Sequence, residues 1–230
     1  MYTNTTGSYN VALGVDALRL NTTASNNNAL GYQAMYSNQT GTQNNAFGYQ
    51  ALYSSTGNDN TAMGQRAAYS TTSGTDNSAF GSTALYSNTT GAYNTALGRD
   101  ALRLNTTASN NTAVGYQAGY TFASTGTGPI TAFGYQAGYS NNTADPRMTA
   151  IGYQALYTHN GGTQENTAVG WRAAYLTTTG SALVSIGNES LYNNTTGTQQ
   201  VAIGYQSLTS NTTGSSNVAI GWRSLYSNTT

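Results

Sequence analysis

The residues of this chain that could perform acid–base or metal chemistry are few and widely spaced. The 230 positions hold one histidine, no cysteine and seven acidic residues. An enzyme needs unlike residues that converge on one place, and no such cluster is visible in the acidic positions. His159 lies in a turn position that asparagine usually occupies, so we expect a solvated turn there. We therefore expect no catalytic residue, no metal site, no cofactor and no enzymatic activity.

The basic residues do not indicate a polyanion partner. All seven are arginines, and they are dispersed along the chain. Asp16 and Arg19 recur as Asp100 and Arg103, 84 residues later, and are interpreted as surface ion pairs worth well under ~1 kcal/mol each. Without a basic stripe, nucleic-acid binding is disfavoured.

Aromatic residues offer the strongest candidate for a binding surface. They recur at two fixed positions of a repeated unit, so that stacked units would form two ladders of rings at ~4.8 Å spacing. The ladders would stabilise the stack or line a contact between chains; alternatively, an exposed aromatic stripe flanked by glutamine and asparagine would bind the sugar rings of a cell-surface glycan. The first candidate column comprises Tyr116, Tyr135, Tyr153, Trp171, Tyr205 and Trp222, and the second comprises Tyr120, Tyr139, Tyr157, Tyr175 and Tyr192.

The unit that positions these residues repeats along the whole chain. Its marker is an Ala-apolar-Gly core, which runs from residues 12–14 to residues 219–221 with glycine spacings of 16 to 19, mostly 17. A fixed period of this length is typical of a solenoid. We predict an all-β fold, a parallel β-solenoid (β-roll) of about 13 coils with a ~17-residue repeat, forming a single domain over residues 1–230.

Each marker glycine follows a short predicted strand. Val or Thr, then Ala, then a large apolar residue alternate with period two, as in residues 201–203. We predict that Val or Thr and the large residue face the inside of the coil and that Ala faces outward. An outer column that accepts only Ala would indicate a closely packed contact, with another part of the coil or with another chain. The alanines assigned to this packing interface are Ala96, Ala113, Ala132, Ala150, Ala168, Ala202 and Ala219.

The second half of each unit is ambiguous. Aromatic, polar, Ala, Leu and Tyr follow the glycine, as in residues 49–53, and fit either a second strand or one helical turn. Five residues are too few for a free-standing helix, so a second strand is favoured. Turns such as residues 87–91 close the unit, and their asparagines should form an amide ladder. The insertions at residues 121–130 and 141–148 are expected to be loops.

Two segments resemble a known repeat family. Residues 201–204 and 218–221, both Val-Ala-Ile-Gly, resemble the repeat of YadA-like heads in trimeric autotransporter adhesins, and whole units such as residues 205–217 are similar to repeats of bacteriophage tail-fibre proteins. This resemblance covers essentially the whole chain. It implies a left-handed parallel β-roll, three parallel chains and a role in attachment.

These observations predict a structural and adhesive fibre protein, a β-solenoid shaft or filament subunit of a phage fibre or a cell-surface appendage. It would self-assemble through coil stacking and side-by-side Ala and Tyr contacts. An ice-binding solenoid is the alternative, based on a Thr-Thr column such as Thr89-Thr90 and Thr195-Thr196. No apolar run approaches the roughly 18–20 residues that span a bilayer, and no secretory signal is recognisable. The expected location is extracellular or on the virion surface, without membrane insertion.

The two ends of the chain carry the same phase of the same repeat. The C-terminal coil of one subunit could stack on the N-terminal coil of the next, and such a contact would propagate as a head-to-tail filament. The predicted partner is therefore a second copy of the chain, in a trimer, a filament or both. The residues assigned to this end-to-end contact are Tyr2, Thr5, Thr6, Tyr226, Thr229 and Thr230.

Overall fold

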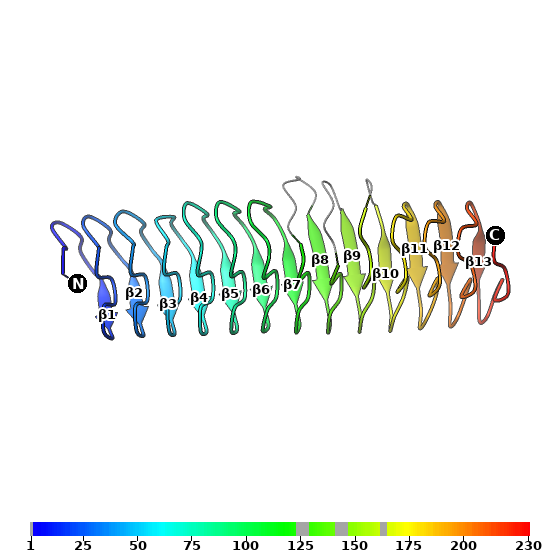
Figure 1. The fold of residues 1–230 in the computed structure, drawn as a ribbon, viewed down its shortest axis with the longest axis horizontal. Helices are drawn as coiled ribbons and strands as arrows, with labels where there is room; N and C mark the ends of the chain where they lie inside the picture. The colour runs from blue at the N-terminus through cyan, green and yellow to red at the C-terminus, as the bar shows by residue number, and fades with distance from the viewer. Residues whose placement is uncertain (1, 123–128, 141–146, 162–164) are drawn as a thin grey trace. The chain divides into compact units, whose positions relative to one another are not determined.

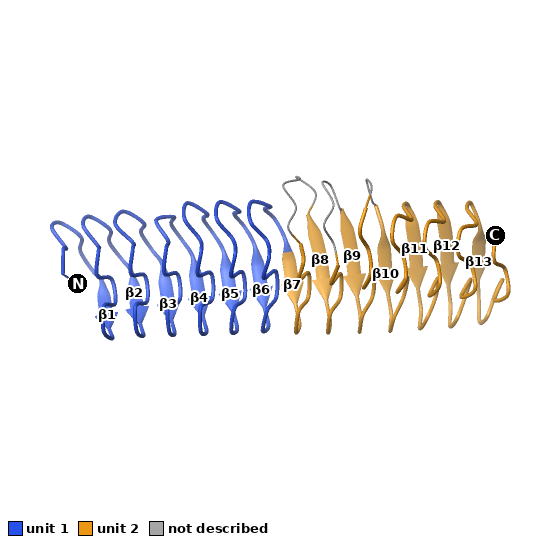
Figure 2. Cartoon of the chain, in the orientation of Figure 1, with its two compact units in different colours: residues 1–111 blue, residues 112–230 orange. Residues whose placement is uncertain are grey.

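The computed structural model describes residues 2–122, 129–140, 147–161 and 165–230. The chain divides into two compact units, residues 1–111 and residues 112–230 (Figure 2). Each unit is a parallel β-solenoid in which every coil contributes one short strand, and no helix occurs among the residues described. This confirms the all-β parallel solenoid and its spacing of about 17 residues. That residues 1–230 form a single domain stays a prediction.

The strands lie side by side in chain order within each unit (Figure 1). The first unit contains β1 (Val11–Leu13), β2 (Asn28–Leu30), β3 (Asn45–Phe47), β4 (Thr61–Met63), β5 (Ser78–Phe80) and β6 (Thr95–Leu97). The second contains β7 (Thr112–Val114), β8 (Ile130–Phe133), β9 (Met148–Ile151), β10 (Thr167–Val169), β11 (Leu183–Ile186), β12 (Gln200–Ile203) and β13 (Val218–Ile220).

Strand pairing is parallel and in register, so equivalent residues of successive coils form columns. Ala113 pairs with Ala132, and Ala132 pairs with Ala150. Alternation along a strand sends neighbouring side chains to opposite faces of the sheet. Equivalent positions of successive coils therefore lie one above the other on the same face, inside or outside.

The strand alanines face inward, which corrects the orientation predicted from the sequence. Ala96, Ala113, Ala132, Ala150, Ala168, Ala202 and Ala219 are all fully buried. The large apolar residue beside each alanine points out instead, and Phe133 remains 55% exposed. The alternation was recognised correctly, but its two faces were assigned the wrong way round. The alanines are indeed closely packed, but inside the coil and not against another chain.

The second half of each unit is not a strand, contrary to the prediction. In residues 48–53, Gln50 and Leu52 adopt positive φ angles of 54° and 49°, and the same alternation recurs in the other coils. This backbone turns Ala51 and Leu52 into the core together, while Tyr49 and Tyr53 point outward. Its amides pair across coils in both directions: Gln50 donates to the carbonyl of Tyr32, and Leu52 donates to that of Ala67.

A left-handed backbone costs about 1 kcal/mol or more at a residue with a side chain. The coil accepts this cost at several positions because each one completes a hydrogen bond to a neighbouring coil. The marker glycine has a stricter requirement. Gly134 has φ +135°, and a β-carbon there would lie 2.5 Å from the carbonyl oxygen of Gly152 in the next coil.

Two columns of buried asparagine complete the core. The predicted turn ladder is present: Asn105 Nδ2 donates to Asn88 Oδ1 at 2.9 Å, and both side chains are buried. Asn-Thr-Thr triplets such as the one at Asn88 thus serve the turn, as interpreted from the sequence. Of the predicted loops at residues 121–130 and 141–148, residues 123–128 and 141–146 lie outside the described residues. Ile130 and Met148 are not loop residues, because they are buried at the start of β8 and β9.

Candidate interaction surface

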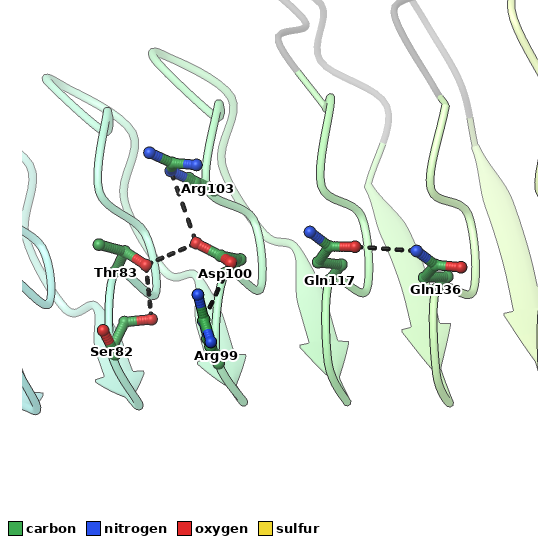
Figure 3. A network of polar contacts seen from close by, with 7 residues as sticks. All are labelled: Ser82, Thr83, Arg99, Asp100, Arg103, Gln117 and Gln136. Atoms are coloured by element: carbon green, nitrogen blue, oxygen red, sulfur yellow. Dashed lines mark hydrogen bonds and ion pairs between the residues drawn. The ribbon is translucent and has the colours of Figure 1, made fainter.

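Some of the charged residues of the described segments form ion pairs. Arg19 Nη1 lies 3.2 Å from Asp16 Oδ1, which confirms that pair. Asp100 is more enclosed than the surface pair that was predicted, with a side chain only 8% exposed. Arg99 Nε and Arg103 Nε each lie 3.5 Å from its carboxylate, and Thr83 Oγ1 donates to it at 2.5 Å (Figure 3). Arg99, Asp100 and Arg103 belong to one coil, and Thr83 ties them to the preceding one.

His159 is buried rather than solvated, which corrects the prediction. Its side chain is fully enclosed, and its Nε2 lies 3.0 Å from Nδ2 of Asn166. It occupies the turn column that asparagine holds in most coils, as expected, but that column faces the core.

One cavity is lined by Arg147, Glu165, Ser181 and Ala182. Its carboxylate is paired, because Arg147 Nη1 lies 2.7 Å from Glu165 Oε1. Within the described ranges no three His, Asp or Glu side chains gather in a way that could hold a metal ion. The repeated outer faces of the coils therefore hold the candidate functional residues.

The outward residues of the strands form one such face. We call it the sheet-face stripe. In the second unit it consists of the two outward strand positions and the residue after the marker glycine, on each of β7–β13. Its apolar column is Val114, Phe133, Ile151, Val169, Ile186, Ile203 and Ile220; beside it lie Thr112, Thr131, Thr149, Thr167, Val184, Val201 and Val218; and after the glycine come Tyr116, Tyr135, Tyr153, Trp171, Asn188, Tyr205 and Trp222.

The aromatic columns stack as predicted. In the second column, rings from Tyr120 through Tyr139, Tyr157 and Tyr175 to Tyr192 lie 5.0 to 5.2 Å apart with interplanar angles of 7 to 14°. In the first, Tyr116, Tyr135, Tyr153 and Trp171 stack at 5.0 to 6.1 Å. Tyr205 and Trp222 continue that position at 44% and 70% exposure.

This stacking restricts what the rings can bind. Inside a stacked segment each ring covers the faces of its neighbours, so only ring edges and hydroxyl groups remain for a ligand. A sugar ring that packs flat on an aromatic side chain needs a free ring face. The geometry thus favours a stabilising role for the ladders over glycan stacking, within the segments that stack.

A ladder of polar side chains accompanies the aromatic columns. Gln136 Nε2 donates to Gln117 Oε1 at 2.8 Å (Figure 3), and Gln154 donates in the same way to Gln136. Arg172 ends the run by donating from Nε to Gln154 Oε1 at 3.1 Å, and its guanidinium carbon lies 4.5 Å from the centroid of the Trp171 ring. This ladder adds side-chain hydrogen bonds to the backbone bonds between coils.

The threonines of the turn are also used between coils. Thr89 Oγ1 donates to the carbonyl of Thr106, and Thr195 Oγ1 donates to that of Thr212, both at 3.0 Å. The first threonine of each of these pairs thus has its hydroxyl proton engaged. A hydroxyl proton that is donated to the neighbouring coil cannot be donated to ice. The geometry of these threonines therefore does not favour the Thr-Thr array of an ice-binding protein.

The residues assigned to an end-to-end contact continue the same repeat. Thr5 donates through its backbone amide and its hydroxyl to the carbonyl of Thr22, at 2.9 and 2.8 Å, and the Thr6 amide donates to it as well. Thr212 donates to the carbonyl of Thr229, and the Tyr226 ring lies 4.9 Å from the guanidinium carbon of Arg223. Tyr2 is 84% exposed and Thr230 is exposed. The contact itself stays a prediction.

Sequence reasoning missed the second asparagine column, which precedes the strands. Asn77 Nδ2 donates to Asn60 Oδ1 at 3.0 Å and to the Gly91 carbonyl at 2.9 Å, and its Oδ1 accepts from the amide and the Nδ2 of Asn94. Every polar atom of this buried side chain is therefore satisfied. The signal was present as an asparagine two residues before the strand alanine in most coils of the first unit.

The fold and its repeated faces define a β-solenoid repeat protein. No family model matches the chain, and neither a curated protein nor a solved structure does so. No helix among the described residues is long and apolar enough to cross a membrane.

Proposed function

We propose that the chain is a structural protein without enzymatic activity, a solenoid shaft or filament subunit of a phage fibre or surface appendage, located on a virion or outside the cell. It would assemble with copies of itself, as a trimer, a head-to-tail filament or both. The resemblance to adhesin heads and tail fibres supports this proposal, as does a surface made of repeated columns.

The observation that carries the proposal is the continuity of hydrogen bonding from coil to coil. Backbone bonds link successive coils through the strand, the left-handed segment and the turn, as in Gly64 to Phe47, Arg66 to Tyr49 and Thr72 to Thr89. Ladders of Asn, Gln and Tyr side chains run in parallel with them. Because each coil contacts mainly its neighbours, every interface between coils within a unit adds its own contribution to stability.

Single-molecule pulling tests this role. When the chain is extended from its two ends, coils should detach one at a time, each releasing about 55–60 Å of chain, the extended length of ~17 residues. Such stepwise resistance is expected of a stack that bears load. Extension of the whole chain in one low-force event would contradict a structural role.

Attachment to a host or surface glycan is the adhesive part of the proposal. The edges and hydroxyl groups of the first aromatic column, with Trp171 40% exposed, would make the contact. A glycan array should then report binding that Trp171→Ala weakens and that the exposed turn variant Thr196→Ala retains. If the array reported no binding, the adhesive part of the proposal would be wrong, and the proposed structural role would remain.

A further inference from the structure

The sheet-face stripe is more apolar than the surface of a lone soluble chain requires. Within β7–β13, Phe133 is 55% exposed, and Ile151 and Ile186 are each 37% exposed. None of the residues of this stripe carries a charge. Contiguous exposed apolar patches usually mark an interaction site.

The extent of the stripe matches a protein interface. Seven strands with three positions each give 21 residues. A standard protein–protein interface takes roughly 20–30 residues from each partner, and its centre is depleted of charge. Because the stripe contains no charged residue, two such faces could meet without burying a charged side chain of the stripe. Burying charged side chains is a large cost when surfaces associate.

The repeat itself selects the partner. The outward side chains form ridges that recur at the strand spacing, ~4.8 Å in parallel sheets, and the stacked rings beside them recur at 5.0 to 6.1 Å. A surface with another period would lose register after a few coils. A surface with the same period could interdigitate along the whole stripe, and a second copy of this chain carries one.

We infer that the sheet-face stripe of residues 112–230 binds the same stripe of a second copy of the chain, with the two sheets packed face to face and their apolar columns interleaved. The inference rests on the proposed structural function and names the surface through which the copies pair. It replaces the side-by-side alanine contact expected from the sequence, since those alanines lie inside the coil. Facing sheets of this kind pack about 10 Å apart.

Oligomeric mass tests the inference. Light scattering coupled to size exclusion, over about 1 to 100 µM, should give at least twice the monomer mass for the wild-type chain. The double variant Phe133→Glu/Ile151→Glu, which places charge on adjacent strands of the stripe, should lose the pairing through the stripe and run at a lower mass than the wild-type chain. The matched control Thr196→Glu/Thr213→Glu adds the same charge to exposed turn positions of two adjacent coils and should keep the wild-type mass.

A second variant separates loss of pairing from loss of folding. Phe133→Thr/Ile151→Thr places β-branched side chains, which favour strands, at both positions. It should also weaken association, by tenfold or more in concentration, with an unchanged circular dichroism spectrum. A wild-type chain that stays monomeric, or stripe variants that assemble as well as the control, would overturn the inference. A wild-type monomer that floats with phospholipid vesicles would also overturn it. If the wild-type chain were monomeric but still unfolded one coil at a time in the pulling experiment, the inferred pairing would be wrong and the proposed structural function would remain.

Discussion

At the scale of single residues, the coil is governed by the small size of its cross-section. One strand, one left-handed segment and one turn enclose the core, and the inward position just before the large apolar residue holds only alanine or, in β11, Ser185. The alternation of small and large residues is visible in the sequence. The sequence does not show which of the two faces lies inside the coil, because the usual rule that large apolar residues are buried gives the wrong face here. The enclosed cross-section, which only the three-dimensional path reveals, decides the orientation.

Adjacent substitutions in β7 test this orientation. Ala113→Leu forces extra volume into a filled core and should lower the free energy of unfolding by roughly 1–3 kcal/mol. Val114→Leu enlarges the neighbouring outward side chain and should change it by less than ~0.5 kcal/mol. Thermal or denaturant unfolding of the two variants gives the comparison. If Val114→Leu proved the more destabilising, the faces would be assigned incorrectly.

The buried asparagine column permits a similar comparison in the first unit. Asn27 is fully buried, donating to Asn10 Oδ1 and the Gly41 carbonyl and accepting from the Asn44 amide, whereas Asn26 is exposed. Asn27→Asp removes the donors and buries a charge, so it should cost at least ~3 kcal/mol near pH 7 and less at acid pH, where the carboxyl group is protonated. Asn26→Asp should be nearly neutral. Equal melting temperatures for the two variants would show that the column is not buried.

At the scale of elements, the strand and the turn were predictable and the left-handed segment was not. Alternating β-branched residues before glycine indicate a strand, and Asn-Thr-Thr-Gly indicates a turn. Alternation also continues after the glycine, which favoured a second strand. Leucine and alanine seldom adopt positive φ, so Leu52 or Ala68 gives no local signal of it. Hydrogen bonds to the two neighbouring coils impose this conformation, and they exist only once the coils are stacked.

The tyrosine ladder should make stability depend on alkaline pH. Burial raises the pKa of Tyr157 above its ordinary value of 10.0, and the neighbouring hydroxyl groups of Tyr139 and Tyr175 raise it further. A raised folded-state pKa means that the stabilisation is complete below about pH 10 and is lost as the pH rises through the folded-state pKa. The melting temperature should therefore fall as the pH rises above about 10. The Tyr157→Phe variant should show a smaller fall in melting temperature than the wild-type chain. An equal fall in the two proteins would show that ionisation of Tyr157 is not the cause.

The coil is also the expected unit of deletion. Removing residues 194–210 takes out one whole repeat of 17 residues, and Asn211 then occupies the column position of Asn194. The shortened chain should fold, with an unchanged type of circular dichroism spectrum, because each coil mainly contacts its neighbours. Removing only residues 194–201 breaks the phase of every later column and should prevent those coils from stacking. A whole-repeat deletion that yields no soluble folded protein would contradict a stack of equivalent coils.

At the scale of the whole molecule, the repeat period was sufficient to predict the architecture. Each of the two compact units uses the same coil, with parallel strands in chain order. The candidate surface was predictable only in part. Its aromatic columns follow from Tyr135 and Tyr153 recurring at one position, but its apolar column was assigned to the core. The sheet-face stripe was therefore recognised only once the exposure of residues such as Phe133 was known.

The central claim is that strands β2–β13 bury a small residue, alanine or Ser185, and display the large apolar residue that follows it. Thiol reactivity measures this directly, because the chain has no cysteine of its own. Ala150→Cys and Ile151→Cys place one thiol on either side of β9, and maleimide labelling at submicromolar concentration compares their access to solvent. We predict that the thiol of Ile151→Cys reacts nearly as fast as in the denatured chain and that the thiol of Ala150→Cys reacts at least 100-fold more slowly. Faster labelling of Ala150→Cys would invert the coil and contradict the account.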